Sequence, residues 1–138
     1  KDKEATIGAK QNLKWLENQY KIKNRYTIEN NDSRRAPDLQ FSGIATETPL
    51  GKILRKKPSD NQAKQILQNF EAYMIPILRH LKRIKKPQAK IAITFPVIRN
   101  LHTDYQKIAN KSGLRIKLQP ILESRKDQFI SRDILILQ

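Results

Sequence analysis

The sequence of 138 residues contains no cysteine. This excludes a disulfide framework, a zinc site with cysteine ligands and a thiol nucleophile, and it fits a reducing compartment such as the cytoplasm. No apolar run approaches membrane-spanning length, and the first residues do not resemble a signal peptide. Neither His80 nor His102 has a carboxylate at the spacing of a metal site, so no metal is expected.

Acidic residues are also few. The chain has 13 Asp and Glu against 28 Lys and Arg, which gives a formal net charge of +15. An excess of this size on a small domain favours a polyanionic partner, above all a nucleic acid. The alternative is a basic surface with no particular partner.

Methionine occurs once, at Met74, and the chain opens with charged residues typical of a first helical turn. We therefore expect a further segment upstream. The length of 138 residues suits a single domain, residues 1–138.

Two segments have strong helical periodicity. Apolar residues recur every three or four positions over 3–20 and more regularly over 63–84. Trp15 lies beside the first pattern, and we expect it to pack in the core. Ser59 and Gln62 form a capping-box pattern at the start of the second helix, and Pro76 predicts a bend or a division near Tyr73.

Strands are predicted at 25–30, 41–46, 90–97, 114–122 and 129–138. The continuous apolar run at 90–97 is typical of a central strand buried on both faces. A helix over 101–112 is expected between this strand and the last two, with Thr103 and Gln106 as its capping box and Gly113 as its end. The order predicts an α/β domain with a mostly parallel sheet that ends in an antiparallel hairpin.

Four segments resemble a known enzyme family. "TETPLGK" (46–52) follows a short strand, as the motif "TDPPYGK" does in the class I, Rossmann-like methyltransferases that methylate RNA amines with S-adenosylmethionine. "DKEATIGAKQNLKWL" (2–16), "NND" (30–32) and "ISRDILIL" (130–137) also resemble segments of these enzymes. The nearest subgroup is the THUMP-associated enzymes that methylate the 2-amino group of guanine in tRNA.

The resemblance implies roles for particular residues. Glu47 would accept a hydrogen bond from the amine that is methylated and lie against the cofactor, and Pro49 would make the turn rigid. Leu50 and Gly51 would lie against the substrate, and Asp32 would accept from the adenine amine of S-adenosylmethionine.

The chain departs from the family pattern at three points. Glu47 replaces Asp or Asn, Thr48 replaces the first proline, and Leu50 replaces the aromatic that stacks on the base. The four glycines are also not spaced as in the cofactor-binding loop. We therefore expect the chain to be the C-terminal part of such an enzyme, incomplete without an upstream segment or a subunit that carries it. A plain surface turn is the alternative interpretation of "TETPLGK".

Two basic runs flank the long helix and could bind RNA, with tRNA as the partner that the resemblance implies. Their residues are Lys52, Arg55, Lys56, Lys57, Arg79, Lys82, Arg83, Lys85 and Lys86. A solvated helix surface is the alternative explanation of these charges. The alternative function is a catalytically inert, methyltransferase-like module that binds RNA or assembles with another subunit.

Overall fold

The computed structural model describes residues 2–23, 25–49, 54, 56–126 and 128–138. The chain divides into two compact units, Lys1–Ala36 and Pro37–Gln138, which we describe separately.

The first unit is built on helix α1 (Lys3–Tyr20), which confirms the predicted helix. Asp2 caps its start, since the backbone N–H of Ala5 donates to the Asp2 carboxylate over 3.1 Å. No residue of α1 is buried, and Trp15 is 60% exposed, so the prediction that Trp15 packs in the core is wrong.

The predicted strand at 25–30 is also wrong. Residues 25–32 adopt neither helix nor strand and lead into a short 3₁₀ helix, η1 (Ser33–Arg35). A strand depends on the hydrogen bonds of a neighbouring strand. Within the described residues no strand pairs with 25–30, so the β propensity of this segment has no effect.

The second unit is built on a sheet with the strand order β1 (Phe41–Thr46), β2 (Lys85–Ile98), β5 (Ile130–Leu137), β4 (Ile121–Glu123). A short strand, β3 (Leu101–His102), also pairs with β2. β1 and β2 are parallel, and β5 is antiparallel to both β2 and β4. Three of the four strands in this order therefore run in one direction, which confirms the predicted α/β sheet with its closing antiparallel hairpin.

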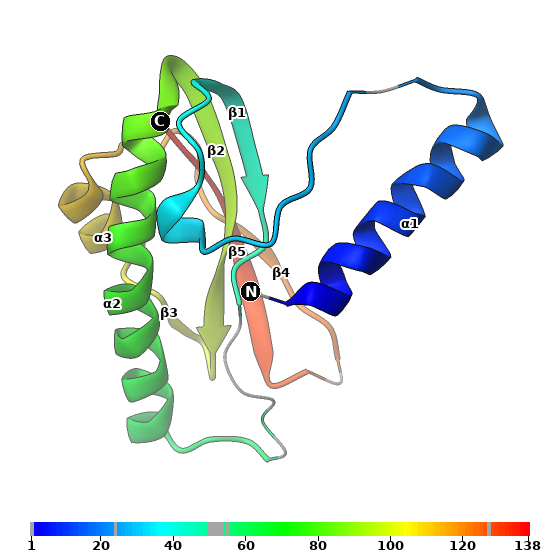
Figure 1. The fold of residues 1–138 in the computed structure, drawn as a ribbon. Helices are drawn as coiled ribbons and strands as arrows, with labels where there is room; N and C mark the ends of the chain where they lie inside the picture. The colour runs from blue at the N-terminus through cyan, green and yellow to red at the C-terminus, as the bar shows by residue number, and fades with distance from the viewer. Residues whose placement is uncertain (1, 24, 50–53, 55, 127) are drawn as a thin grey trace. The chain divides into compact units, whose positions relative to one another are not determined.

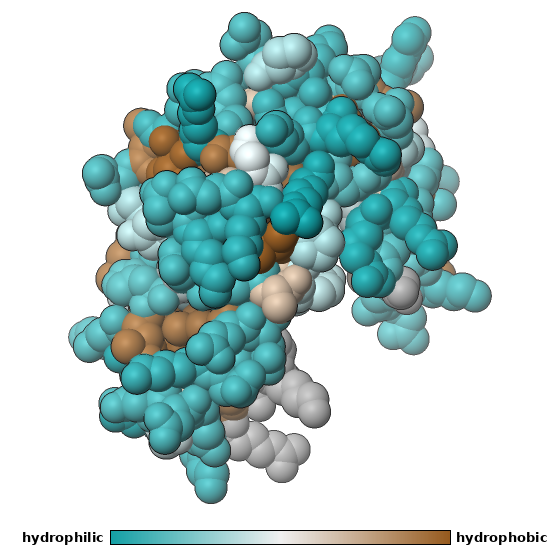
Figure 2. Space-filling view, turned by 90° about the vertical axis from the view of Figure 1, so that its left-hand side faces the viewer, coloured by the Kyte–Doolittle hydropathy of each residue, from teal (hydrophilic) through white to brown (hydrophobic). Residues whose placement is uncertain are grey.

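Helices α2 (Asp60–Ile84) and α3 (Tyr105–Ser112) lie together on one side of this sheet (Figure 1). The apolar face of α2 packs on β2, where the rings of Phe70 and Phe95 meet edge to face with centroids 5.6 Å apart. Hydrophilic side chains dominate the outer surface of this side, as expected of an amphipathic helix (Figure 2).

The capping box of α2 is confirmed: the Ser59 N–H donates to Gln62 Oε1 over 2.8 Å, and the Gln62 N–H donates to Ser59 Oγ. Pro76 does not divide the helix, which is continuous to Ile84. Proline removes one backbone hydrogen bond, but the adjacent Ile77 and Leu78 are buried, and their packing compensates for this loss.

The third helix begins later than predicted. Leu101 and His102 belong to β3, and the cap of α3 is Asp104, whose carboxylate accepts from the Lys107 N–H over 2.9 Å. Thr103 is not the cap because its hydroxyl is buried and donates to the Pro96 carbonyl over 2.7 Å. Gly113 ends α3 with a φ of 70°, as predicted.

The next predicted strand, 114–122, is shorter than expected. Only Ile121–Glu123 forms β4, while residue Ile116 makes an isolated bridge to Leu137. Pro120, which has no N–H, lies between the two paired regions and cannot donate to a ladder.

A buried carboxylate joins the two helices. Glu71 of α2 is 6% exposed, and its Oε1 accepts from the backbone N–H of Asp104 over 3.1 Å. Its Oε2 accepts from Lys107 Nζ over 2.8 Å, and this hydrogen bond is the main reason that the pKa of Lys107 is raised. Glu71 therefore holds the first turn of α3 against α2.

Replacing Glu71 by alanine should lower the free energy of unfolding by about 1–3 kcal/mol, because the backbone N–H of Asp104 loses its acceptor in a partly buried hydrogen bond. Urea denaturation measures the change, with the exposed Glu29→Ala as the matched control. Equal stability of the two variants would contradict the role of Glu71. Because the raised pKa of Lys107 lies above 10.5, its contribution should persist below pH 10.5 and disappear as the pH rises through that pKa.

Candidate active site

The parallel pairing of β1 and β2 brings the carboxyl ends of both strands to one edge of the sheet (Figure 1). The described part of "TETPLGK", residues 46–49, begins at the end of β1 and lies beside β2. Ligands of open α/β sheets bind at this kind of edge. Leu50, Gly51, Lys52 and Arg55 lie outside the described residues.

Thr48 fixes this segment to the sheet. The residue is 4% exposed; its N–H donates to Thr94 Oγ1 over 3.1 Å, and its hydroxyl donates to the Thr94 carbonyl over 2.7 Å. The family pattern has proline at this position, where the ring restricts the backbone. In this chain two hydrogen bonds to β2 restrain it instead.

Replacing Thr48 by valine keeps the shape of the side chain and removes the hydroxyl. The expected loss in the free energy of unfolding is about 1 kcal/mol, the typical net contribution of a hydrogen bond. Thermal unfolding measures this loss. Thr48→Ser retains the hydroxyl donor, so its free energy of unfolding should be close to that of the unchanged chain. A valine variant as stable as the serine variant would show that the hydroxyl is not an anchor.

Glu47 lies at the rim of the same edge. Its side chain is 62% exposed, and its Oε1 lies 2.8 Å from Arg132 Nε on β5. Although the two charges are close, Arg132 Nε is buried and makes no well-formed hydrogen bond among the described residues, so the contact is an ion pair. Pro49, two residues after Glu47, is exposed.

Arg132 also donates from Nη1 to Glu123 Oε2 over 3.0 Å. This hydrogen bond, followed by one from Arg125, holds the pKa of Glu123 below 4.5. The guanidinium therefore lies between the carboxylates of Glu47 and Glu123 and restrains both. Sequence reasoning assigned no role to Arg132, whose partners lie on other segments.

Arg132→Gln should raise the pKa of Glu123, because it removes the strongest hydrogen bond to that carboxylate. Carbon-detected NMR titration of the side-chain carboxyl measures this, and Arg125→Gln, which removes the weaker bond, should raise it less. The stability contribution of Glu123 should be present above pH 4.5 and disappear as the pH falls through its lowered pKa. A larger effect of Arg125→Gln would refute this assignment.

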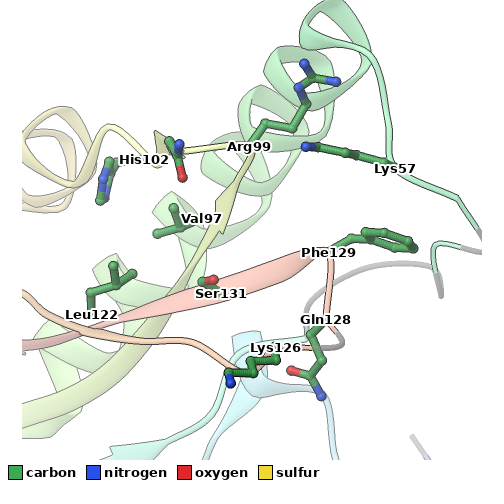
Figure 3. Close-up of a pocket in the computed structure, with 10 residues that line it drawn as sticks. Lys57, Val97, Arg99, His102, Leu122, Lys126, Gln128, Phe129 and Ser131 are labelled. Atoms are coloured by element: carbon green, nitrogen blue, oxygen red, sulfur yellow. The ribbon is translucent and has the colours of Figure 1, made fainter.

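A cavity of about 330 Å³ opens near the carboxyl end of β2 (Figure 3). Its lining includes Lys57, Arg99, His102, Lys126 and Phe129. The described residues of "TETPLGK", including Glu47, do not line it. The structure thus presents two polar groupings at one end of the sheet, one around Glu47 and one around this cavity.

His102 has a carboxylate partner that its sequence neighbours do not reveal. Its Nδ1 lies 2.6 Å from Oδ2 of Asp133, which is 1% exposed and 31 residues away. A buried carboxylate needs such a partner. Within the part of the chain that the structure describes, no group of three His, Asp or Glu side chains could hold a metal ion.

The described basic residues of the two predicted runs are not brought together. Lys56 and Lys57 precede α2, while the second run begins at Arg79, 19 residues after the start of this helix, or about 29 Å at about 1.5 Å per residue. Several residues of the second run have structural contacts. Arg79 Nε donates to the Lys111 carbonyl over 2.8 Å, and Lys85 is buried with its Nζ donating to two backbone carbonyls.

The rest of the second run is more exposed. Lys82 and Lys86 are exposed, Lys82 extends to Gly113, and Arg83 contacts His80 Nδ1 through Nη2 over 3.1 Å. These residues lie at the edge of the sheet where β2 begins, opposite the edge that carries Glu47. A single nucleotide at the candidate site therefore cannot contact the described residues of both runs.

Asp32, in the first unit, caps η1. Its Oδ1 accepts from the N–H and the Nε of Arg34, each over 3.0 Å, and its Oδ2 accepts from Arg34 Nη2 over 2.7 Å. The expected adenine acceptor therefore already binds a guanidinium. No described helix is both long and apolar enough to cross a membrane.

Comparison with known proteins identifies the fold. No protein-family model matches the sequence, and no curated protein matches it. Two solved structures of one protein of Thermus thermophilus, a candidate DNA modification methylase, match 78% of this chain.

The structure bound to S-adenosyl-L-methionine has a TM-score of 0.51 and 17% identity, and another structure of the protein has 0.52 and 18%. The chain spans 50% and 51% of their lengths, respectively. This likeness shows that the chain has the Rossmann-like fold of about half of that methylase.

Proposed function

We propose that the chain is part of an S-adenosylmethionine-dependent methyltransferase that acts on an exocyclic amine of a nucleic-acid base. The substrate that the sequence resemblance favours is guanine in tRNA, which would place the enzyme in the cytoplasm. The observation that carries the proposal is the position of Glu47. This carboxylate follows β1 on a segment anchored by Thr48, at the carboxyl edge of a methyltransferase-type sheet.

The reaction needs an acceptor at this position. The amine nitrogen attacks the methyl carbon, the carbon–sulfur bond breaks, and the sulfur keeps the electron pair as S-adenosylhomocysteine leaves. The nitrogen then loses one proton, which Glu47 or solvent accepts. An exocyclic amine is a weak nucleophile because its lone pair is delocalised into the ring, and an acceptor for its N–H directs the lone pair toward the methyl group.

Arg132 supports this role of Glu47. It contacts Oε1 of Glu47 and thereby orients the carboxylate, while the second oxygen remains a potential acceptor for an amine N–H. Pro49 follows two residues later and restricts the turn. Arg132 is thus a positioning residue in this proposal.

The residues of this chain fit only part of the methyl donor. Glu47 can face it from the sheet edge. Asp32, in the first unit, already binds Arg34 through both carboxylate oxygens, so its role toward the adenine amine stays a prediction of the resemblance. None of the four glycines is spaced as in the glycine-rich loop that binds this methyl donor. The proposal therefore includes a further polypeptide segment or subunit that carries the rest of the cofactor site.

The ion pair of Glu47 with Arg132 also favours the second candidate, an inert methyltransferase-like module that binds RNA or assembles with another subunit. In such a module the carboxylate would be structural. The replacement of the stacking aromatic by Leu50 agrees with this candidate.

The full-length gene product should bind S-adenosylmethionine in calorimetry and transfer radiolabelled methyl groups to tRNA. Glu47→Ala should reduce the rate by about 100-fold, as for the loss of one transition-state hydrogen bond, with Glu29→Ala as the matched control. Full activity of Glu47→Ala would refute the role of Glu47. Absence of both cofactor binding and transfer in the unchanged protein would refute the enzyme and favour the module.

A further inference from the structure

The cavity beside β2 is formed by segments that are distant in sequence. Val97 and Ser131 come from the paired ends of β2 and β5, Leu122 comes from β4, and Lys57 comes from the segment before α2 (Figure 3). Its volume of about 330 Å³ lies at the small end of the range of ligand sites, about 300–1,000 Å³. It is large enough to hold part of a nucleotide.

The rim of the cavity is cationic. Lys57, Arg99 and Lys126 line it, and its lining includes no carboxylate among the described residues. Oδ1 of Asp60 lies 2.6 Å from Arg99 Nε, and Oδ2 of Asp133 lies 2.6 Å from His102 Nδ1. The cationic rim favours an anion.

The turn that carries Arg99 is well defined. Arg99 and Asn100 have φ values of 52° and 64°, as in the two-residue turns of tight β-hairpins, and they connect β2 to β3. Arg99 Nη1 donates to the Pro58 carbonyl over 2.9 Å. This contact and the ion pair with Asp60 hold the guanidinium at the rim.

His102 adds an oriented polar group. Because Asp133 binds Nδ1, the second ring nitrogen, Nε2, lies on the opposite side of the ring. In the neutral ring with Nδ1 protonated, Nε2 is an acceptor; in the charged ring it is a donor. Either form can contact a sugar or base edge.

Phe129 supplies an aromatic surface. Its side chain is 44% exposed and lies beside the cavity at the end of the hairpin (Figure 3). An exposed aromatic ring beside several cations is the usual composition of single-stranded nucleic-acid sites, where the ring stacks on a base and the cations contact phosphates.

The cavity and Glu47 use opposite faces of the sheet. Adjacent residues of a strand point to opposite faces, and Arg132 contacts Glu47 while Asp133 contacts His102. Asp133 pairs with Phe95, which packs against α2, so the cavity belongs to the face covered by helices. A single base cannot both lie in the cavity and meet Glu47 on the other face.

We infer that this cavity binds one nucleotide of a single-stranded nucleic acid, next to the nucleotide presented to Glu47. Lys57, Arg99 and Lys126 contact its phosphates, and Phe129 stacks on its base. The choice of nucleic acid as the ligand rests on the proposed function, but the binding itself requires neither methyl transfer nor the methyl donor.

Fluorescence anisotropy of short, labelled single-stranded RNA and DNA with the 138-residue chain tests the inference in the absence of S-adenosylmethionine. Phe129→Leu should weaken binding by about tenfold, as expected from the loss of one stacked base, and Phe129→Trp should retain it. Circular dichroism checks that both variants fold. Equal affinity of Phe129→Leu and the unchanged chain for both probes would overturn the inference.

A charge-matched pair separates this site from general attraction to a basic protein. Lys57→Gln should weaken binding and reduce the slope of log affinity against log salt by about 1, as for one phosphate contact. Lys117→Gln, an equal charge change at an exposed residue beside the last residues of β5, should have little effect on the slope. Equal effects of the two variants would overturn the inference. Loss of methyl transfer in the full-length protein, with these binding results unchanged, would refute only the proposed function.

Discussion

The parallel pairing of β1 with β2 is the constraint on which the candidate site depends. It aligns Thr46 with Ile93 and thereby brings Thr48 beside Thr94, where two hydrogen bonds fix the segment after β1. Without this pairing, Glu47 would lie on an unattached loop with no defined distance to Arg132. The polar groups of "TETPLGK" are thus placed by backbone pairing first and by side-chain contacts second.

The reversed strand β5 completes the arrangement. Because it runs antiparallel between β2 and β4, its first residues, not its last, lie at the edge that carries Glu47. The alternation of side chains then sends Arg132 to one face and Asp133 to the other. The adjacent residues Arg132 and Asp133 therefore form an ion pair with Glu47 and a hydrogen bond with His102, respectively.

Features that depend on neighbours in the sequence could be predicted. The capping box of Ser59 and Gln62, the left-handed Gly113 and the central strand rich in apolar residues are local patterns with local causes. The prediction of a strand at 25–30 was wrong because the β propensity of these residues cannot supply a strand for them to pair with. The buried carboxylate of Glu71 could not be foreseen, since its partner Lys107 lies 36 residues away.

The candidate site shows the same limit. Glu47 could be proposed from a motif, but Arg132 and the pair of His102 with Asp133 exist only once β5 lies beside β2. For the predicted basic residues, too, only the fold shows which of them lie near the candidate site, because α2 separates the described residues of the two runs.

Net charge and site geometry therefore act at different ranges. A charge of +15 produces a field that attracts a polyanion from any side and is screened over about 10 Å at 0.1 M salt. Selecting one nucleotide needs groups at fixed positions, and buried partners provide them: Asp133 for His102, and β2 for the turn of Arg99. Composition can thus favour a class of partner, while the paired strands fix the positions of the groups in the proposed site.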